Sequence, residues 1–209
     1  RQRQMCIRDR LKPLHDTFCI KHINVCTYQA VSGSGKDGVE ELLQQSSAYI
    51  DQRSIDKKVY PKQIAFNSIP FVDCFLENNY TREEMKMVWE THKILDENIS
   101  VNPTAVRVPV LVGHAESIYI ETEKEIDIEL AKNCLNEFAG ISVIDNVQEV
   151  DFPTSFEHGH GTDDVYVGRI RKGLSKNNSL NLWVVADNVR KGAALNSIQI
   201  AENLVGSKM

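Results

Sequence analysis

Residues 22–50 read HINVCTYQAVSGSGKDGVEELLQQSSAYI. The first part, His22–Gln29, is short and rich in β-branched and aromatic residues, which predicts a strand. The Gly/Ser run Ser32–Gly35 predicts a turn, and Asp37–Ile50 has the pattern of an amphipathic helix. A strand that leads through a turn into a helix favours an α/β or α+β domain in which helices cover a sheet.

The rest of the chain continues this mixture of strands and helices. Four further segments alternate or run apolar as strands do: Ala105–Val112, Ser117–Glu123, Val165–Lys172 and Leu180–Ala186. Three further helices are expected: from the N-cap Thr81 to about Leu95, from Asp127 to about Ala139, and over Gly192–Leu204. Glu84 completes a capping box with Thr81, and Gly140 is expected to cap the second of these helices.

Two segments between these elements are expected to lack regular structure. Pro61 and Pro70 interrupt Val59–Asp73, and each would break a helix. Asn188–Lys191 is expected to form a turn. We therefore expect one domain without internal repeats.

The composition is that of an ordinary globular protein. Hydrophobic residues make up 42% and charged residues 25%, which argues against a disordered chain and a membrane protein. No apolar run approaches the ~20 residues that span a bilayer, and no signal peptide is present, so we expect a cytoplasmic protein. The net charge is −5, with Lys and Arg scattered among Asp and Glu. Without a basic stripe, nucleic acid is not an expected partner.

Residues 1–10, RQRQMCIRDR, are expected to be a non-native or artefactual segment, because they carry four Arg, two Gln and no apolar periodicity. The domain is then expected over residues 11–209. The five cysteines show no paired C-x-x-C spacing. They are interpreted as reduced thiols and not as a disulfide framework or a zinc site.

The stretch from Tyr28 to Gly35 is the first candidate site. Its small residues let the backbone approach a ligand closely, and the helix that follows offers free N–H groups to an anion. A plain turn between a strand and a helix explains the same pattern.

Arg107 and His114 form the second candidate. An Arg among valines in a strand needs a partner, and its guanidinium fits a carboxylate. His114 follows Gly113 at a strand end and can transfer protons near neutral pH. From these residues alone, a structural ion pair and a surface histidine are the favoured reading.

The third candidate is the pair Glu83 and Lys86, which lie three residues apart and so on one face of a helix. A solvated ion pair is the alternative reading. His158 and His160 share a loop without a third ligand, and no metal site is predicted there.

Six blocks of the sequence carry a family resemblance. They read LKPLHDTF, TYQAVSGSGKDGVEEL, IAFNSIPFVDCFLENNYTREEMKMVWETHKIL, VRVPVLVGHAES, DDVYVGRIRK and LNLWVVADNVRKGAALNSIQIAENL. In this order and spacing, from about residue 11 to about residue 205, they resemble the C-terminal half of bacterial aspartate-semialdehyde dehydrogenases. The resemblance implies an α+β domain like the C-terminal domain of glyceraldehyde-3-phosphate dehydrogenase. Such a domain has a mixed sheet with helices on one face and a dimer contact on the other.

The resemblance also implies an activity. The family reduces L-aspartyl-4-phosphate to L-aspartate 4-semialdehyde with NADPH, through a cysteine thioester. This step leads to methionine, to threonine and, by way of diaminopimelate, to lysine. The implied partners are therefore the aspartyl phosphate or semialdehyde, NADP and a second copy of the chain.

Five residues receive catalytic or substrate-binding roles from the resemblance. His114 would be the general acid/base, and Gln29 would orient the acyl intermediate. Arg107 would clamp the substrate α-carboxylate, Glu83 would meet the amino group, and Lys86 would help to bind the phosphate.

Three further residues are implied to face the cofactor. Ser32 and Gly33 lie in the family's cofactor-facing turn, and Asn188 falls where the family contacts the nicotinamide carboxamide. The family's Rossmann-type NADP-binding domain is absent from this sequence, so most of the cofactor site is expected to be missing.

The family's nucleophile also lacks a counterpart. It is a cysteine in an Asn-Cys-Ser/Thr context, and counting back from Leu11 places it at about position 2, which is Gln2. Cys6 lacks that context and is displaced by about four residues, or ~6 Å along a helix. We therefore expect the chain to be inactive by itself.

Two alternatives remain open. One is a non-catalytic dimerisation or binding module that keeps the substrate groove. The other is a related N-acyl-glutamyl-phosphate reductase, against which the Glu83/Lys86 helix and the spacing from Arg107 to His114 argue.

Overall fold

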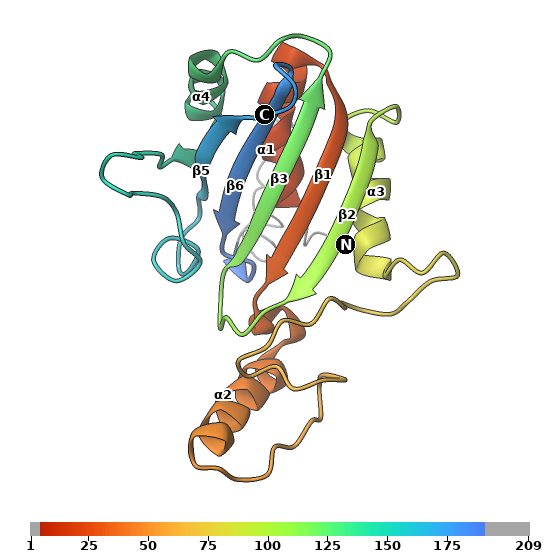
Figure 1. The fold of residues 1–209 in the computed structure, drawn as a ribbon, viewed down its shortest axis with the longest axis vertical. Coiled ribbons are helices and arrows are strands. Elements are labelled where there is room, and N and C mark those ends of the chain that lie inside the picture. Colours follow the sequence, from red (N-terminus) through yellow and green to blue (C-terminus); the bar gives the residue numbers. More distant parts are fainter. Residues whose placement is uncertain (1–4, 191–209) are drawn as a thin grey trace, which may run out of the picture.

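The computed structural model describes the backbone of residues 5–190 and the side chains of residues 11–190. Its helical elements are α1 (Met5–Phe18), the 3₁₀ turn η1 (Val31–Ser34), α2 (Lys36–Ile50), α3 (Arg82–Ile94) and α4 (Ile128–Asn136). Its strands are β1 (Ile20–Gln29), β2 (Ser100–Arg107), β3 (His114–Thr122), β4 (Ile141–Val143), β5 (Val165–Lys172) and β6 (Ser179–Ala186). Figure 1 shows these elements around one large sheet.

The described strands form one mixed sheet in the order β2-β1-β3-β6-β5-β4. The pairs β1–β2 and β4–β5 are parallel, and the other neighbours are antiparallel. The expectation of an α+β domain with a mixed sheet is therefore confirmed.

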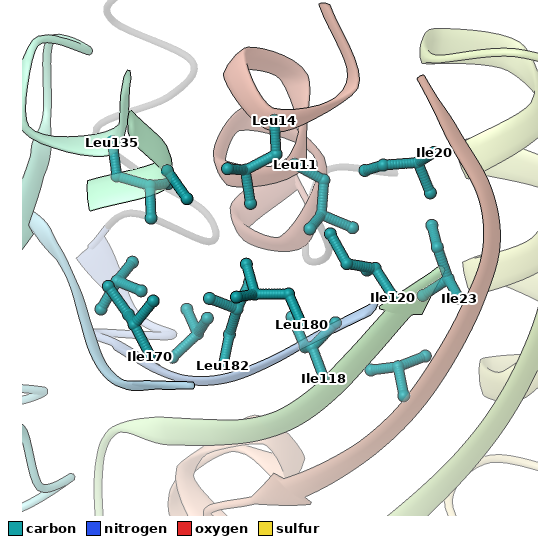
Figure 2. Packing of buried hydrophobic residues seen from close by; sticks show 14 of the residues in the cluster. Leu11, Leu14, Ile20, Ile23, Ile118, Ile120, Leu135, Ile170, Leu180 and Leu182 are labelled. Atoms are coloured by element: carbon teal, nitrogen blue, oxygen red, sulfur yellow. The ribbon is translucent and has the colours of Figure 1, made fainter. Parts of the chain in front are cut away.

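One face of this sheet carries the main hydrophobic core, because α1, α3 and α4 pack against it. Figure 2 shows side chains from helices and strands meeting there: Leu11, Leu14, Ile20, Ile23, Ile118, Ile120, Leu135, Ile170, Leu180 and Leu182. Burial of each such side chain stabilises the fold by roughly 1.5–3 kcal/mol relative to leaving it in water. The helices are thus held on one side of the sheet, as expected.

The opposite face carries polar and aromatic side chains. Side chains alternate along a strand, so Tyr28, Tyr119 and Trp183 point away from the core and are half-buried. The rings of Tyr28 and Trp183 lie 5.5 Å apart between centroids. In Figure 1 this is the near face of the sheet, and no helix of the described residues crosses it. We call it the open face.

Helix α2 and the irregular segment after it project from one end of the sheet (Figure 1). We call residues 36–68 the arm. A second, smaller core joins the arm to η1 through the buried side chains of Val31, Leu42, Tyr60, Ile64, Ala65 and Ile69. The irregular structure expected after Val59 is confirmed.

Most predicted elements are confirmed to within three residues at each end, and the capping box at Thr81 and Glu84 is present with both of its hydrogen bonds. The strand predicted over Ala105–Val112 is wrong in its bounds, because β2 begins at Ser100 and ends at Arg107. Pro103 lies inside β2, which is tolerated since β2 is an edge strand of the described sheet.

The residues beyond β2 leave the sheet and support the turn η1. The carbonyls of Val110 and Leu111 accept hydrogen bonds from the backbone N–H groups of Val31 and Ser32, at 2.8 and 3.1 Å. Val110 and Leu111 therefore hydrogen-bond to the turn η1 and not to a neighbouring strand.

Helix α4 ends earlier than predicted. Its C-cap is Glu137, not Gly140, because Phe138 N–H turns back to the Leu135 carbonyl and tightens the chain. Gly140 has a φ of 80° in the turn that follows. The three-residue strand β4 was not predicted.

Three predictions fall wholly or partly on residues that the structure does not describe. The turn predicted over Asn188–Lys191 is described only as far as Arg190, with turn residues at 188 and 189. The helix predicted over Gly192–Leu204 lies outside the described residues. Helix α1 begins at Met5, inside the segment expected to be non-native or artefactual, and that expectation stays a prediction. Within the described part of the chain, no helix has the length and apolar character needed to cross a membrane.

Candidate functional site

Predicted site residues gather at one end of the sheet, and strand ends bring four of the eight there. Gln29 ends β1 and pairs in register with Arg107, which ends the parallel strand β2. His114 begins the antiparallel strand β3, and its partner on β6 is Ala186, two residues before Asn188. Strand directions therefore bring together residues from three distant parts of the sequence.

The backbone of Ala30 connects the side chains of Arg107 and His114. The guanidinium of Arg107 donates from Nη1 to the Ala30 carbonyl at 2.7 Å. The Ala30 N–H donates to Nδ1 of His114 at 3.1 Å. Because Nδ1 accepts this bond, the neutral imidazole carries its hydrogen on Nε2. In this tautomer Nε2–H of His114 is a hydrogen-bond donor.

Gly33 lies directly against both side chains. A Cβ atom at this position would lie 2.7 Å from Nη1 of Arg107 and 3.4 Å from Nε2 of His114. The first distance is shorter than van der Waals contact, so any larger residue would displace the guanidinium or the turn. Glycine at position 33 keeps Arg107 and His114 close to η1.

Gln29 connects this group to helix α3. Its side-chain amide donates to Oγ1 of Thr27 and to Oε1 of Glu83, both at 3.3 Å. Glu83 is buried, and its other oxygen pairs with Nζ of Lys86 at 3.1 Å. Glu83 and Lys86 therefore do lie on one helix face, but not as a fully solvated pair.

Lys86 has a second carboxylate partner that was not predicted from the sequence. Its Nζ lies 3.2 Å from Oδ2 of Asp73, in the irregular segment before α3. Burial lowers the pKa of Lys86, but its hydrogen bonds and charge contacts with Glu83 and Asp73 outweigh burial and raise that pKa above its ordinary value. Lys86 is thus a cation throughout the neutral range.

Ser32 and Asn188 form a third contact at the same end of the sheet. The amide nitrogen of Asn188 donates to Oγ of Ser32 at 3.0 Å, and its amide oxygen accepts from Gly113 N–H at 3.0 Å. The neighbouring Asp187 is buried and accepts from the N–H groups of Gly161, Val189 and Arg190. Asp187 therefore fixes the turn that presents Asn188.

Glu84 has a second function beyond the predicted capping box. Its Oε2 accepts from Thr81 N–H at 2.7 Å, and its Oε1 accepts from the N–H of Ala105 in β2 at 2.9 Å. Ala105 precedes Arg107 by two residues. Glu84 therefore joins the start of α3, with Glu83 and Lys86, to the strand that carries Arg107.

In the EHGHG loop, residues 157–161, His158 has a structural role. Nδ1 of His158 accepts from Thr154 N–H at 3.2 Å, and its ring packs against Tyr166. Across the described residues, no group of three or more His, Cys, Asp or Glu is placed to hold a metal ion.

Residues 11–191 match the family model described as "Semialdehyde dehydrogenase, dimerisation domain". The sequence is 56% identical over 196 residues to an aspartate-semialdehyde dehydrogenase of Shewanella violacea. That match covers 93% of this chain and 57% of the relative. This chain therefore spans little more than half the length of the curated relatives it matches.

Solved structures give the same result for the fold. Aspartate semialdehyde dehydrogenase II of Vibrio cholerae, complexed with ASA, superposes with a TM-score of 0.94 at 48% identity, covering 98% of this chain and 60% of that chain. The Candida albicans aspartate semialdehyde dehydrogenase with NADP superposes with a TM-score of 0.67 at 25% identity, covering 93% of this chain and 53% of that chain.

Proposed function

Because this chain belongs to the semialdehyde dehydrogenase family through its dimerisation domain, we propose that it forms the catalytic and dimerisation part of an aspartate-semialdehyde dehydrogenase. The full enzyme would reduce L-aspartyl-4-phosphate with NADPH. The observation that carries the proposal is the arrangement around Ala30. The side chains of Arg107 and His114 both hydrogen-bond to the Ala30 backbone, and both lie against Gly33.

The substrate offers a carboxylate, an ammonium group and an acyl phosphate, and the site offers a group for each. Arg107 provides a planar fork of donors for the α-carboxylate. Glu83 provides an anion for the ammonium group, and Lys86 provides a cation for the phosphate. Gln29 donates to Glu83 and pairs in register with Arg107, and its amide would hold the acyl oxygen. The three charges thus orient the acyl carbon for attack.

His114 would act in this reaction through Nε2. As the cysteine thiol implied by the family attacks the acyl carbon, the bond to the phosphate oxygen breaks, and the thiol proton leaves with the phosphate as HPO₄²⁻. The Ala30 N–H occupies Nδ1, so Nε2–H of the neutral ring would donate to the acyl oxygen as negative charge develops on it. After reduction of the thioester the C–S bond breaks, and Nε2–H would donate to the departing thiolate.

The residues near η1 fit a nicotinamide cofactor. Asn188 and Ser32 are half-buried and present an amide and a hydroxyl beside Gly113, which precedes His114. These groups match the donors and acceptors of a carboxamide. When bound, NADPH supplies the hydride. Asn188 and Ser32 would orient its carboxamide, and Gly33 leaves room beside His114.

A fusion of this chain with the missing part of a relative, called the joined enzyme below, tests this function. The part of the Shewanella violacea relative that precedes the match is fused to this chain at Leu11, which supplies the cofactor domain and the nucleophile. We expect NADPH-dependent turnover of aspartyl phosphate, and we expect His114→Ala to lower it by about 10²–10⁴-fold. His160→Ala, which removes an exposed histidine, should leave turnover unchanged. A joined enzyme that folds and binds phosphate without turnover would favour the non-catalytic module instead.

We also propose that the open face forms a homodimer contact. It carries half-buried aromatic side chains with no helix of the described residues over them, and aromatic residues are enriched at such interfaces. Tyr28→Lys places a charge in the middle of this face and should shift the chain to monomers in sedimentation measurements. Tyr80→Lys, on an exposed loop before α3, is the matched control. Dimers that persist in Tyr28→Lys would place the contact elsewhere.

A further inference from the structure

Lys86, the residue proposed to bind phosphate, lies between two carboxylates. Its Nζ is 3.1 Å from Oε2 of Glu83 and 3.2 Å from Oδ2 of Asp73. A phosphate dianion that approaches Lys86 must therefore replace or tolerate an anion already in contact with it. The catalytic roles described above leave Asp73 without a function.

Backbone contacts on the C-terminal side of Asp73 fix its position. The next residue, Cys74, accepts from Arg82 N–H at 2.8 Å through its carbonyl, and Phe75 forms a bridge with Thr81. Both contacts fasten the segment to the start of α3. The rings of Phe71 and Phe75, on either side of Asp73, lie 4.9 Å apart between centroids. Asp73 has a φ of 74°, a left-handed conformation that few non-glycine residues adopt.

The two carboxylates differ in how firmly they hold Lys86. The Glu83 side chain is 10% exposed, belongs to the same helix as Lys86 and also accepts from Gln29. The Asp73 side chain is 32% exposed and comes from a loop. Water can solvate a displaced Asp73 but not a displaced Glu83, so an incoming anion would replace Asp73.

We propose that Asp73 competes with phosphate for Lys86 and thereby sets the affinity of the phosphate subsite; this inference rests on the proposed function. Without phosphate, Asp73 pairs with Lys86 and holds it beside Glu83. When the phosphoryl group or inorganic phosphate binds, it takes the place of the Asp73 carboxylate, which turns to water. Asp73 therefore favours release of phosphate after the thioester has formed.

The expected effect is modest because the pair is partly exposed. Ion pairs of this kind contribute only a small stabilisation, equivalent to about a 2- to 5-fold change in affinity. Asp73→Asn keeps the size and the polar character of the side chain but removes its charge. It should therefore lower the KM for inorganic phosphate by about 2- to 5-fold in the oxidative direction, in which phosphate is a substrate. The kcat in that direction should stay unchanged.

The measurement uses the joined enzyme in the oxidative direction, in which inorganic phosphate is a substrate along with the semialdehyde and NADP. Asp51→Asn is the matched control, because it also removes an aspartate paired with a basic residue, Arg53, but on the arm. It should leave the KM for phosphate unchanged. The difference between the parent and Asp73→Asn should also shrink as ionic strength rises, since salt screens exposed charges. A purely structural role would not produce that salt dependence.

A second variant separates this inference from the proposed function. Lys86→Ala should raise the KM for phosphate, and in its background Asp73→Asn should have no effect, because the two residues then no longer interact. If Lys86→Ala leaves that KM unchanged, the proposed phosphate role of Lys86 is wrong. If Lys86→Ala raises it but Asp73→Asn leaves it unchanged or raises it, only the competition proposed here is wrong.

A binding measurement keeps the inference testable if the joined enzyme does not turn over. Inorganic phosphate is titrated into the 209-residue chain and followed by the broadening of its phosphorus NMR signal. Tighter binding by Asp73→Asn than by the parent supports the competition, and equal or weaker binding overturns it.

Discussion

Two buried glutamates on two helices, Glu41 in the arm and Glu83 at the end of the sheet, have opposite kinds of partner. The carboxylate of Glu41 accepts from the backbone N–H groups of three successive residues, 58–60, and from the Gln45 amide. The carboxylate of Glu83 has side-chain partners, the Gln29 amide and the Lys86 ammonium. Both residues are less than a tenth exposed.

The difference separates a structural carboxylate from one that a ligand can use. Backbone N–H groups cannot move without unfolding the segment that carries them, so the partners of Glu41 are fixed by the fold. Side chains can turn toward a new partner at the cost of a rotamer change. The side-chain partners of Glu83 fit the substrate role proposed for it, whereas Glu41 holds the segment after α2 in place. Burial alone does not distinguish the two.

Glu83→Gln should have the largest effect on activity. It removes the charge proposed to meet the substrate ammonium, and hydrogen bonds to charged groups are worth roughly 1.5–3 kcal/mol. We expect kcat/KM of the joined enzyme to fall by about 10- to 100-fold, with little change in the melting temperature. An equal loss of stability and activity would remove the distinction between Glu83 and Glu41.

Glu41→Gln should have the opposite effect, a loss of local stability with little loss of activity. The glutamine has one acceptor oxygen, so backbone N–H groups that now donate to a carboxylate would face an amide NH₂ and lose their partner, at about 1–3 kcal/mol. Amide hydrogen exchange at residues 58–60 should become about 10- to 30-fold faster. Glu40→Gln, at an exposed neighbouring position paired with Lys36, should leave exchange unchanged. Unaltered protection in Glu41→Gln would contradict the structural role.

Glu84→Gln should have the smallest of the three effects. Its two oxygens accept from Thr81 N–H at the helix start and from Ala105 N–H in β2, and a glutamine satisfies only one of them. We expect a loss of about 1 kcal/mol in the free energy of unfolding by urea. The exposed Glu97→Gln is the control. A loss of activity as large as that of Glu83→Gln would mean that Glu84 contacts the substrate itself.

The features predictable from the sequence are those in which the interacting residues are near one another. The capping box at Thr81 and Glu84 spans one helical turn, and strand β5 (Val165–Lys172) has the bounds that its apolar pattern predicts. The resemblance to the semialdehyde dehydrogenases then named the candidate residues. Neither source gives a distance, a partner or a protonated atom.

Contacts between distant residues required the tertiary structure. Lys86 and Asp73 are 13 residues apart, and Asp73 lies in a segment without a periodic pattern. Ser32 and Asn188 are 156 residues apart. Such pairs depend on strand order and direction, which a pattern along one segment does not contain. The misplaced bounds of β2 have the same cause, because Pro103 is acceptable only at the edge of a sheet.

The sequence by itself determined the fold class, the family and the identity of the candidate residues, because periodicity and ordered motifs are properties of the chain alone. The tertiary structure decided that Ala30 joins Arg107 to His114, that Nδ1 of His114 accepts from the Ala30 N–H, and that Asp73 shares Lys86 with Glu83. These facts depend on where the strand ends meet, and hydrogen bonds and charge contacts act only over the few ångströms that this meeting creates.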